Sequence, residues 1–350
     1  MNEGDKPKRR VRYKGTHPKK FGEKYKELDP EKYSDDVEKI KQQGKTPAGM
    51  HRSIMVKEIL EFLQVKPGQV GMDATLGYGG HSAEILKALQ GDGKKKKTGK
   101  LFATDVDPIE LPKTKARLEA IGFDPESINI RKMNFGNIDL VVNESGLLNF
   151  VLADLGVSSM QIDDPQRGFS FKTDAPLDLR LNPKTGISAA SFLKTVSQAQ
   201  LEEILVENSD EIYAEEISGA IYISLRKGRS IDTTSHLKAI IASTLSELAQ
   251  DDIKKACQRT FQALRIAIND EFGMLNKFLE KLPTALAPGG RVAILTFHSG
   301  EDRRVKKSFQ HLFREGIYSE WSAEPVRPSA EECFQNPRAK ATKMRWAIKR

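Results

Sequence analysis

The chain has 350 residues, of which 38% are hydrophobic, and a formal net charge of +8 at pH 7. This length accommodates two domains, or one large domain with an insertion. No apolar run reaches the length of a membrane span, and the first residues lack a signal peptide's hydrophobic stretch. We therefore expect a cytoplasmic protein without membrane contact, and the basic surplus favours a polyanionic partner such as nucleic acid.

The two cysteines of the chain, Cys257 and Cys333, do not stand in a metal-ligand spacing such as C-x-x-C. We expect two reduced, unpaired thiols and no metal site.

Two basic segments stand apart from the rest of the chain. Residues 1–50 hold 14 Lys or Arg against 9 Asp or Glu and show almost no aliphatic periodicity. We interpret them as a basic N-terminal arm, which either docks on RNA or on the protein's own surface, or is a tail without function. The run Lys94–Lys97 lies between glycines and predicts a surface loop, more often a solvated turn than an RNA contact.

After residue 50, short apolar runs alternate with helical patterns. This alternation predicts a doubly wound α/β domain with a parallel sheet. The predicted strands are Val70–Ala74, Leu101–Thr104, Ile128–Lys132, Phe150–Ala153, Arg291–Phe297 and Met344–Ile348. The predicted helices between them are residues 54–63, Ser82–Leu89, Pro112–Ile121 and a long one at Phe261–Leu282.

Between residues 159 and 259 the strand pattern stops. Helical patterns take its place at Ala189–Lys194, Gln198–Glu207, Ala214–Arg226 and Thr234–Ala249. We therefore predict a helical substrate-recognition domain at 159–259, inserted between two parts of the α/β domain at 51–158 and 260–350.

A glycine-rich loop, DATLGYGGHS, begins at a predicted strand end and opens a helix. Glycines such as Gly77 and Gly79 permit a tight turn, and a helix N-terminus offers free N–H groups to a ligand. The loop is shared by dinucleotide, phosphate and S-adenosylmethionine sites, and a loop without a ligand is also conceivable. Asp73, just before the glycines, suits a cofactor that carries an amino group better than one that carries a pyrophosphate.

Three further polar positions follow predicted strands. Asp105 can accept hydrogen bonds from the ribose of a nucleoside cofactor, whereas Asp107 could do so or cap the next helix. Phe135 could cover an adenine or belong to the core. Asp154 begins the polar cluster DLGVSSMQ at the end of the most hydrophobic strand, where ligands bind in open α/β sheets.

Four sequence blocks carry a family resemblance. DATLGYGGHS, DLGVSSMQIDDPQRGFSF with PLDLR, FQALRIAINDE, and PGGRVAILTFHSGEDRRVKK resemble, in order, the signature blocks of the RsmH (MraW) family. Members of that family are 16S rRNA cytosine-N4 methyltransferases. The resemblance runs from about residue 51 to the C-terminus, and it departs from the family pattern mainly in presumed substrate-facing segments.

The resemblance implies a class I, Rossmann-like S-adenosylmethionine-dependent methyltransferase fold with an inserted helical domain. It implies small-subunit rRNA or the 30S subunit as partner, and a homodimer would be compatible with it. The S-adenosylmethionine contacts that it implies are Gly79, Gly80, His81, Asp105, Phe135, Asp154 and Gln161, to which the residues themselves add Asp73 and Gly77.

For methyl transfer to an exocyclic amine we assign a hydrogen-bond acceptor role to Asp154, with Ser158 or Ser159. His298 orients the base or shuttles the proton, or it only supports the strand end. Basic residues near the predicted crevice would contact phosphates: Arg167, Arg180, Arg265, Arg303, Arg304, Lys306 and Lys307.

Three alternatives remain open at this point. The glycine loop and Asp105 also fit an NAD-linked dehydrogenase, although the pattern is G-x-G-G rather than G-x-G-x-x-G. The chain could also be a non-catalytic RNA-binding or ribosome-assembly factor, or a paralogue that methylates another RNA nucleotide.

Overall fold

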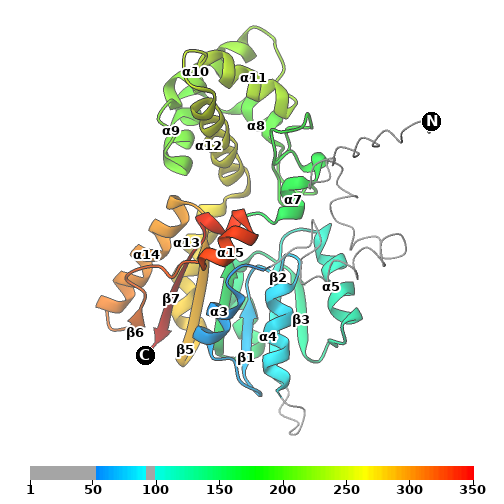
Figure 1. The fold of residues 1–350 in the computed structure, drawn as a ribbon, viewed down its shortest axis with the longest axis vertical. Helices are drawn as coiled ribbons and strands as arrows, with labels where there is room; N and C mark the ends of the chain where they lie inside the picture. The colour runs from blue at the N-terminus through cyan, green and yellow to red at the C-terminus, as the bar shows by residue number, and fades with distance from the viewer. Residues whose placement is uncertain (1–52, 92–98) are drawn as a thin grey trace, which may run out of the picture. The chain divides into compact units, whose positions relative to one another are not determined.

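The computed structural model describes residues 53–91 and 99–350. The predicted basic arm and the Lys94–Lys97 loop lie outside the described residues. Figure 1 shows the fold and labels most of the helices and strands.

A single mixed sheet forms the centre of the α/β part (Figure 1). Its strand order is β3-β2-β1-β4-β5-β7-β6, and β1 to β5 pair in parallel, whereas β7 pairs antiparallel with both β5 and β6. This arrangement confirms the Rossmann-like α/β fold, but the sheet predicted as parallel is mixed, because β7 runs antiparallel to both of its neighbours. The strands are β1 (Val70–Asp73), β2 (Lys100–Asp105), β3 (Ile128–Lys132), β4 (Leu148–Asp154), β5 (Leu286–Thr296), β6 (Tyr318–Trp321) and β7 (Lys343–Lys349).

Helices cover both faces of the sheet because its central strands are apolar on both sides. Alternate residues of β4 belong to different cores: Val151 packs in one and Leu152 in the other. The Val151 side is covered by α6 (Ile138–Ser145), α13 (Glu271–Ala285) and α14 (Ser299–Arg314). The Leu152 side is covered by α3 (Val56–Leu63), α4 (Gly80–Gln90) and α5 (Glu110–Ala120).

The segment between β4 and β5 is helical, and the helices α8 to α12 share a hydrophobic core of their own. Buried Leu205, Ile217, Leu237 and Leu264 contribute to that core from four different helices. This arrangement supports the predicted helical insertion, whose domain boundaries remain a prediction; the boundary at 259 falls within α12. The helices are α7 (Ser159–Asp163), α8 (Ala189–Thr195), α9 (Gln198–Ser209), α10 (Ala214–Arg226), α11 (Thr234–Thr244) and α12 (Gln250–Asn269).

The helix predicted over Phe261–Leu282 is two helices. Asp270 has a left-handed backbone (φ 49°, ψ 41°), which ends α12 and starts α13. Aspartate tolerates this conformation better than most side chains, so periodicity alone did not reveal the break. The helix predicted over Thr234–Ala249 ends at Thr244. Strand β6 and helices α14 and α15 (Ala330–Gln335) were not predicted.

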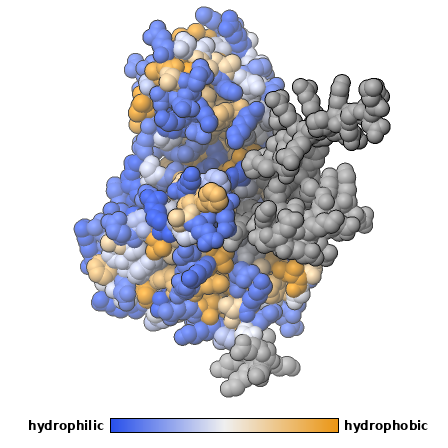
Figure 2. Space-filling view, viewed as in Figure 1, coloured by the Kyte–Doolittle hydropathy of each residue, from blue (hydrophilic) through white to orange (hydrophobic). Residues whose placement is uncertain are grey.

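The described surface carries apolar side chains on several different elements. Ile212, Ile223 and Phe334 are the most exposed of the large ones other than Ile121. On the face shown in Figure 2, hydrophobic residues are interspersed with hydrophilic ones. No described helix is long and apolar enough to span a membrane.

Candidate functional site

The predicted site residues gather at the carboxyl ends of adjacent parallel strands. Asp73, Asp105 and Asp154 are the last residues of β1, β2 and β4, and β1 lies between β2 and β4 in the sheet. Since parallel strands end at the same edge, the three carboxylates meet where open α/β sheets bind ligands.

The glycine-rich loop closes over this edge between β1 and α4. Gly77 and Gly79 both have positive φ, +48° and +85°, and Gly79 is the residue before the first turn of α4. A Cβ at Gly79 would lie 2.8 Å from Cγ2 of Thr114, so both the turn and the close packing require glycine there. The Thr114 hydroxyl donates to the Gly77 carbonyl and fixes the loop against α5.

Asp73 fixes the glycine-rich loop through two hydrogen bonds that its carboxylate accepts. One oxygen accepts the Ser82 hydroxyl at 2.6 Å, and the other accepts the Thr75 N–H at 3.1 Å. Burial raises the pKa of this carboxyl, while those hydrogen bonds and the nearby His81 lower it. Both oxygens thus already have partners within the chain, which indicates that Asp73 shapes the loop.

Asp105 connects the end of β2 to the same loop. Its Oδ2 accepts the Gly77 N–H at 2.8 Å and its Oδ1 accepts the Asp107 N–H at 2.9 Å. Burial raises the pKa of Asp105 to about 6, against the lowering effect of these two bonds. A carboxylate oxygen has two lone pairs, so each oxygen retains the capacity to accept a further ligand hydroxyl.

Asp107 caps the helix that follows, as the sequence left open. Its Oδ1 accepts the Ile109 N–H at 2.8 Å. Its Oδ2 accepts from Gln161 Nε2 at 2.7 Å and from the Arg167 guanidinium at 2.8 Å. Arg167 also donates to the Leu181 carbonyl at 2.7 Å. This buried network ties the loop after β2 to the start of the helical segment, and its members lie too far apart in sequence to have been predicted.

Asp154 has a carboxylate oxygen that can still accept a hydrogen bond from a ligand. Its N–H donates to the Thr75 hydroxyl at 2.6 Å, which places the strand end beside the glycine-rich loop. Its Oδ1 is buried and has no hydrogen-bond partner within residues 53–91 and 99–350. Its Oδ2 lies 3.5 Å from Nδ1 of His81. Burial raises the pKa of Asp154 to about 6; His81 lowers it, and Asp73 and Glu301 raise it further.

The residues after Asp154 build a helix start. Ser158 is the N-cap of α7: its hydroxyl accepts the Gln161 N–H, and Gln161 Oε1 accepts the Ser158 N–H at 2.8 Å. This capping box satisfies N–H groups that a helix start leaves free. Ser158 and Gln161 therefore have structural partners, whereas Ser159 is the first residue of α7 and is partly exposed.

His298 stands at the end of β5, just before α14. Its Nε2 lies 3.2 Å from Oε1 of buried Glu301, and Glu301 Oε2 accepts the Phe297 N–H at 2.8 Å. Burial favours a raised pKa for Glu301, but the contact with His298, the Phe297 N–H and the charge of Arg265 together lower it. Sequence reasoning assigned His298 to the site and missed Glu301, although both belong to one helix start.

Phe135 lies at the start of the short helix η2 (Phe135–Asn137), which follows β3. Its ring meets that of Phe278 edge-on, with centroids 5.3 Å apart, and it packs partly buried against the core. Both interpretations of Phe135 therefore stay open: it contributes to the core, and part of its ring remains accessible.

The predicted phosphate contacts divide into two groups. Lys306 and Lys307 are exposed on α14. The five arginines make contacts within the chain. Arg167 is buried on Asp107, Arg265 pairs with Glu271 at 2.8 Å, Arg180 pairs with Asp178 at 2.7 Å, Arg303 reaches Asp210 at 3.1 Å, and Arg304 stacks 3.5 Å from the Phe272 ring centroid.

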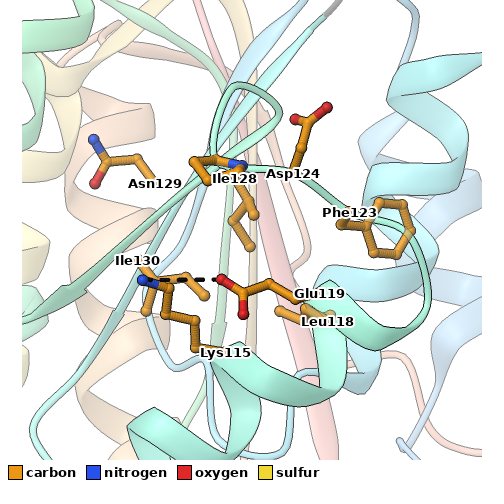
Figure 3. A pocket seen from close by; sticks show the side chains of 9 residues that line it. Lys115, Leu118, Glu119, Phe123, Asp124, Ile128, Asn129 and Ile130 are labelled. Atoms are coloured by element: carbon orange, nitrogen blue, oxygen red, sulfur yellow. Dashed lines mark ion pairs between the residues drawn. The ribbon is translucent and has the colours of Figure 1, made fainter.

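A pocket lies elsewhere, at the sheet edge formed by β3. Figure 3 shows Leu118, Phe123 and Ile128 lining it between α5 and β3, with Lys115 and Glu119 paired at 3.9 Å beside them. None of the predicted site residues lines this pocket. In the part of the chain that the structure describes, no group of three or more His, Cys, Asp or Glu could hold a metal ion.

The strand order is that of a Rossmann-like α/β methyltransferase fold. The chain belongs to the MraW methylase family, whose model matches residues 48–350.

Similar proteins support this membership. The chain is 64% identical to "Ribosomal RNA small subunit methyltransferase H 1" of Lachnoclostridium phytofermentans over 98% of this chain and 93% of that one. It is 61% identical to "Ribosomal RNA small subunit methyltransferase H 2" of Alkaliphilus metalliredigens over 99% of both chains. It is 38% identical to "Ribosomal RNA small subunit methyltransferase H" of a Cyanothece strain over 86% of this chain and 95% of that one.

Proposed function

We propose that the chain transfers a methyl group from S-adenosylmethionine to the N4 amine of a cytidine in small-subunit rRNA. The observation that carries the proposal is Asp154 Oδ1, a buried carboxylate oxygen without a partner among the described residues, next to the glycine-rich loop. An unsatisfied buried acceptor is costly, so its presence at a ligand-binding edge indicates a donor supplied by a ligand.

The residues present fit S-adenosylmethionine. The first turn of α4, from Gly80, would hold the negatively charged carboxylate of its amino-acid part, because a helix N-terminus favours anions. Asp105 would accept the ribose hydroxyls, and the accessible part of Phe135 would cover the adenine. When bound, the cofactor supplies an electrophilic methyl group on a sulfonium.

The chain's own contribution to the reaction is to bind and orient the amine. The lone pair of cytosine N4 is delocalised into the ring, which makes the amine a weak nucleophile. Asp154 would accept a hydrogen bond from it, align it, and take up the proton that leaves it. Exocyclic nitrogen needs no covalent cysteine intermediate, and Cys257 lies buried in the core of the helical segment.

An RNA substrate is supported by the relatives, whose names specify the small-subunit ribosomal RNA. A base must leave its stack to reach a site at the strand ends, so the target cytidine would be flipped or would already lie in a loop. The helical segment would hold the surrounding RNA, since it adjoins the site through Arg167 and through the contact of Asp210 with Ser299 and Arg303.

The test is methyl transfer by the purified protein, with labelled S-adenosylmethionine and either naked 16S rRNA or 30S subunits that lack the modification. Nucleoside mass spectrometry should find N4-methylcytidine with the wild type and none with Asp154→Asn. The matched control Asp178→Asn changes a carboxylate in the helical segment and should retain activity. Methylation of another nucleotide would establish a paralogue with a different target and overturn the N4-cytidine assignment.

The N-terminal arm, residues 1–50, is relevant to the possibility that the chain is a paralogue with a different target. The 61% and 64% identical relatives align over 98–99% of this chain, whereas the 38% identical one aligns over 86%, and the family model begins at residue 48. The sequence of the arm is thus shared with some relatives, which supports a contact specific to that subgroup. We propose RNA or ribosomal protein as its partner; deletion of residues 1–50 should weaken subunit binding but not cofactor binding.

A further inference from the structure

The pair formed by His81 and Asp154 allows the protons of the site to be placed. His81 is buried in the first turn of α4, and its Nε2 lies 2.9 Å from the carbonyl oxygen of Ile54. A carbonyl oxygen only accepts hydrogen bonds, so Nε2 must carry a proton. In a neutral imidazole the other nitrogen, Nδ1, then has a lone pair and no proton.

That second nitrogen faces a carboxylate. Nδ1 lies 3.5 Å from Asp154 Oδ2, and both atoms would be acceptors if the ring were neutral and the carboxyl ionised. Two further carboxylates act on Asp154: Asp73 at the end of β1 and Glu301 in the first turn of α14. Asp73 and Asp154 both interact electrostatically with His81, so a bare lone pair at Nδ1 is unfavourable, and a proton there converts the repulsion into an ion pair.

We propose that His81 is a positioning residue of the methyl transfer, which carries a proton on Nδ1 and thereby keeps Asp154 ionised and fixes its Oδ2. Asp154 Oδ1 is then the oxygen that receives the proton of the substrate amine. The inference deepens the proposed function and rests on it for the identity of the amine, but the protonation of the pair itself does not depend on the substrate.

The proton balance of the step is simple. As the amine nitrogen forms its bond to the methyl carbon, the bond between that carbon and sulfur breaks, and its electron pair stays on sulfur. The proton released by the nitrogen goes to Asp154 Oδ1 and then to solvent when the product leaves. His81 keeps both ring protons throughout, so its part is electrostatic.

Removal of the positive charge should have a defined sign. His81 lowers the pKa of Asp154, which burial has raised to about 6, so a neutral residue at position 81 should raise it further. If it rises by about one unit, kcat/KM should fall roughly fivefold at pH 6 and stay within about twofold at pH 8.5, where Asp154 is ionised in either case.

Two substitutions separate the functions of the ring. His81→Gln places an amide nitrogen near the Nε2 position and can still donate to Ile54, but it carries no charge. His81→Asn places its amide near the Nδ1 position and can donate to Asp154, again without charge. The matched control is His236→Gln, which changes an exposed histidine on α11.

The first readout is the carbon-13 titration of the Asp154 carboxyl in the cofactor-free protein, with the signal assigned by its loss in Asp154→Asn. The second is the affinity for S-adenosylhomocysteine by calorimetry, and the third is the pH profile of kcat/KM. We expect both His81 variants to raise the pKa of Asp154 and to move the acid limb of the profile upward by the same amount. His236→Gln should change neither.

An unchanged pKa of Asp154 in both variants overturns the proposal. If affinity for S-adenosylhomocysteine falls at the same time, His81 is a cofactor contact and nothing more. Failure of the proposed function looks different. In that case the wild type methylates no small-subunit rRNA, while the Asp154 titration still responds to the His81 variants.

Discussion

At the scale of single residues, the Asp154 carboxylate that the proposed reaction needs also lowers the stability of the fold at neutral pH. Asp154 has a folded-state pKa of about 6 because it is buried, against an ordinary value of 3.8. Between these two values the folded protein binds more protons than the unfolded chain. Stability from this group is therefore complete below pH 3.8, decreases as the pH rises through 6, and is absent at neutral pH.

Asp154→Asn should therefore be more stable than the wild type at pH 8, by about 3 kcal/mol. This advantage should vanish below about pH 4, where the wild-type carboxyl is protonated. Urea unfolding at both pH values measures it. Asp178→Asn is the opposite case, because the ion pair with Arg180 outweighs burial and lowers the pKa of Asp178. Asp178→Asn should therefore be less stable than the wild type at neutral pH. If both variants changed the free energy of unfolding in the same direction, the opposite pKa shifts of Asp154 and Asp178 would be contradicted.

The Arg167–Asp107 ion pair predicts a second residue effect. Both side chains are buried, with 5% and 0% of their surface exposed. Arg167→Leu leaves an uncompensated charge on Asp107 and should destabilise the fold by about 3–5 kcal/mol. Adding Asp107→Asn, which retains the helix cap, should restore a large part of that loss. If the double variant is no more stable than the single one in denaturant unfolding, the pair is not what holds these segments together.

At the scale of elements, the junction between α12 and α13 depends on one left-handed residue. Asp270 adopts φ 49°, a conformation that costs a β-branched side chain more than aspartate and costs glycine nothing. Asp270→Val should therefore lower the free energy of unfolding by about 1–2 kcal/mol, whereas Asp270→Gly should change it by less than about 0.5 kcal/mol. Thermal unfolding of the two variants tests this, and similar losses in both would assign the effect to the carboxylate instead.

The sequence predicted elements best where burial and periodicity coincide. Strand β4 was predicted within two residues because its apolar run marks a buried parallel strand. Strand β3, INIRK, was predicted with its observed bounds although it is a partly buried edge strand. Strand β6, YSEW, was missed because a four-residue edge strand has too little pattern. The position of the site was predicted because its carboxylates stand at the ends of the predicted strands. The Asp107–Arg167 pair was not predicted, since a contact across 60 residues leaves no local signal. Glu301 was also missed, although it lies only three residues after His298.

At the scale of the whole molecule, the net charge of +8 favours binding to RNA. Of the predicted phosphate contacts, the five arginines interact with other residues of the chain, which leaves the two lysines as the candidates for binding RNA. Lys306 and Lys307 are exposed on α14, close to the end of β5. If they neutralise phosphates, replacing both with Ala should weaken RNA binding and lower the salt slope of log Kd by about 1–2. The control pair, Lys66 and Lys87, lies at the opposite end of the sheet and should leave the slope unchanged.

The central claim is methylation of a cytidine amine in small-subunit rRNA through Asp154. Its most direct test is mass-spectrometric nucleoside analysis of small-subunit rRNA from cells with and without this gene, with the lost mark mapped to its position. We predict that deletion removes N4-methylcytidine, that the wild-type gene restores it, and that Asp154→Asn does not. An unchanged rRNA profile on deletion would contradict the account, even if the purified protein still bound S-adenosylmethionine.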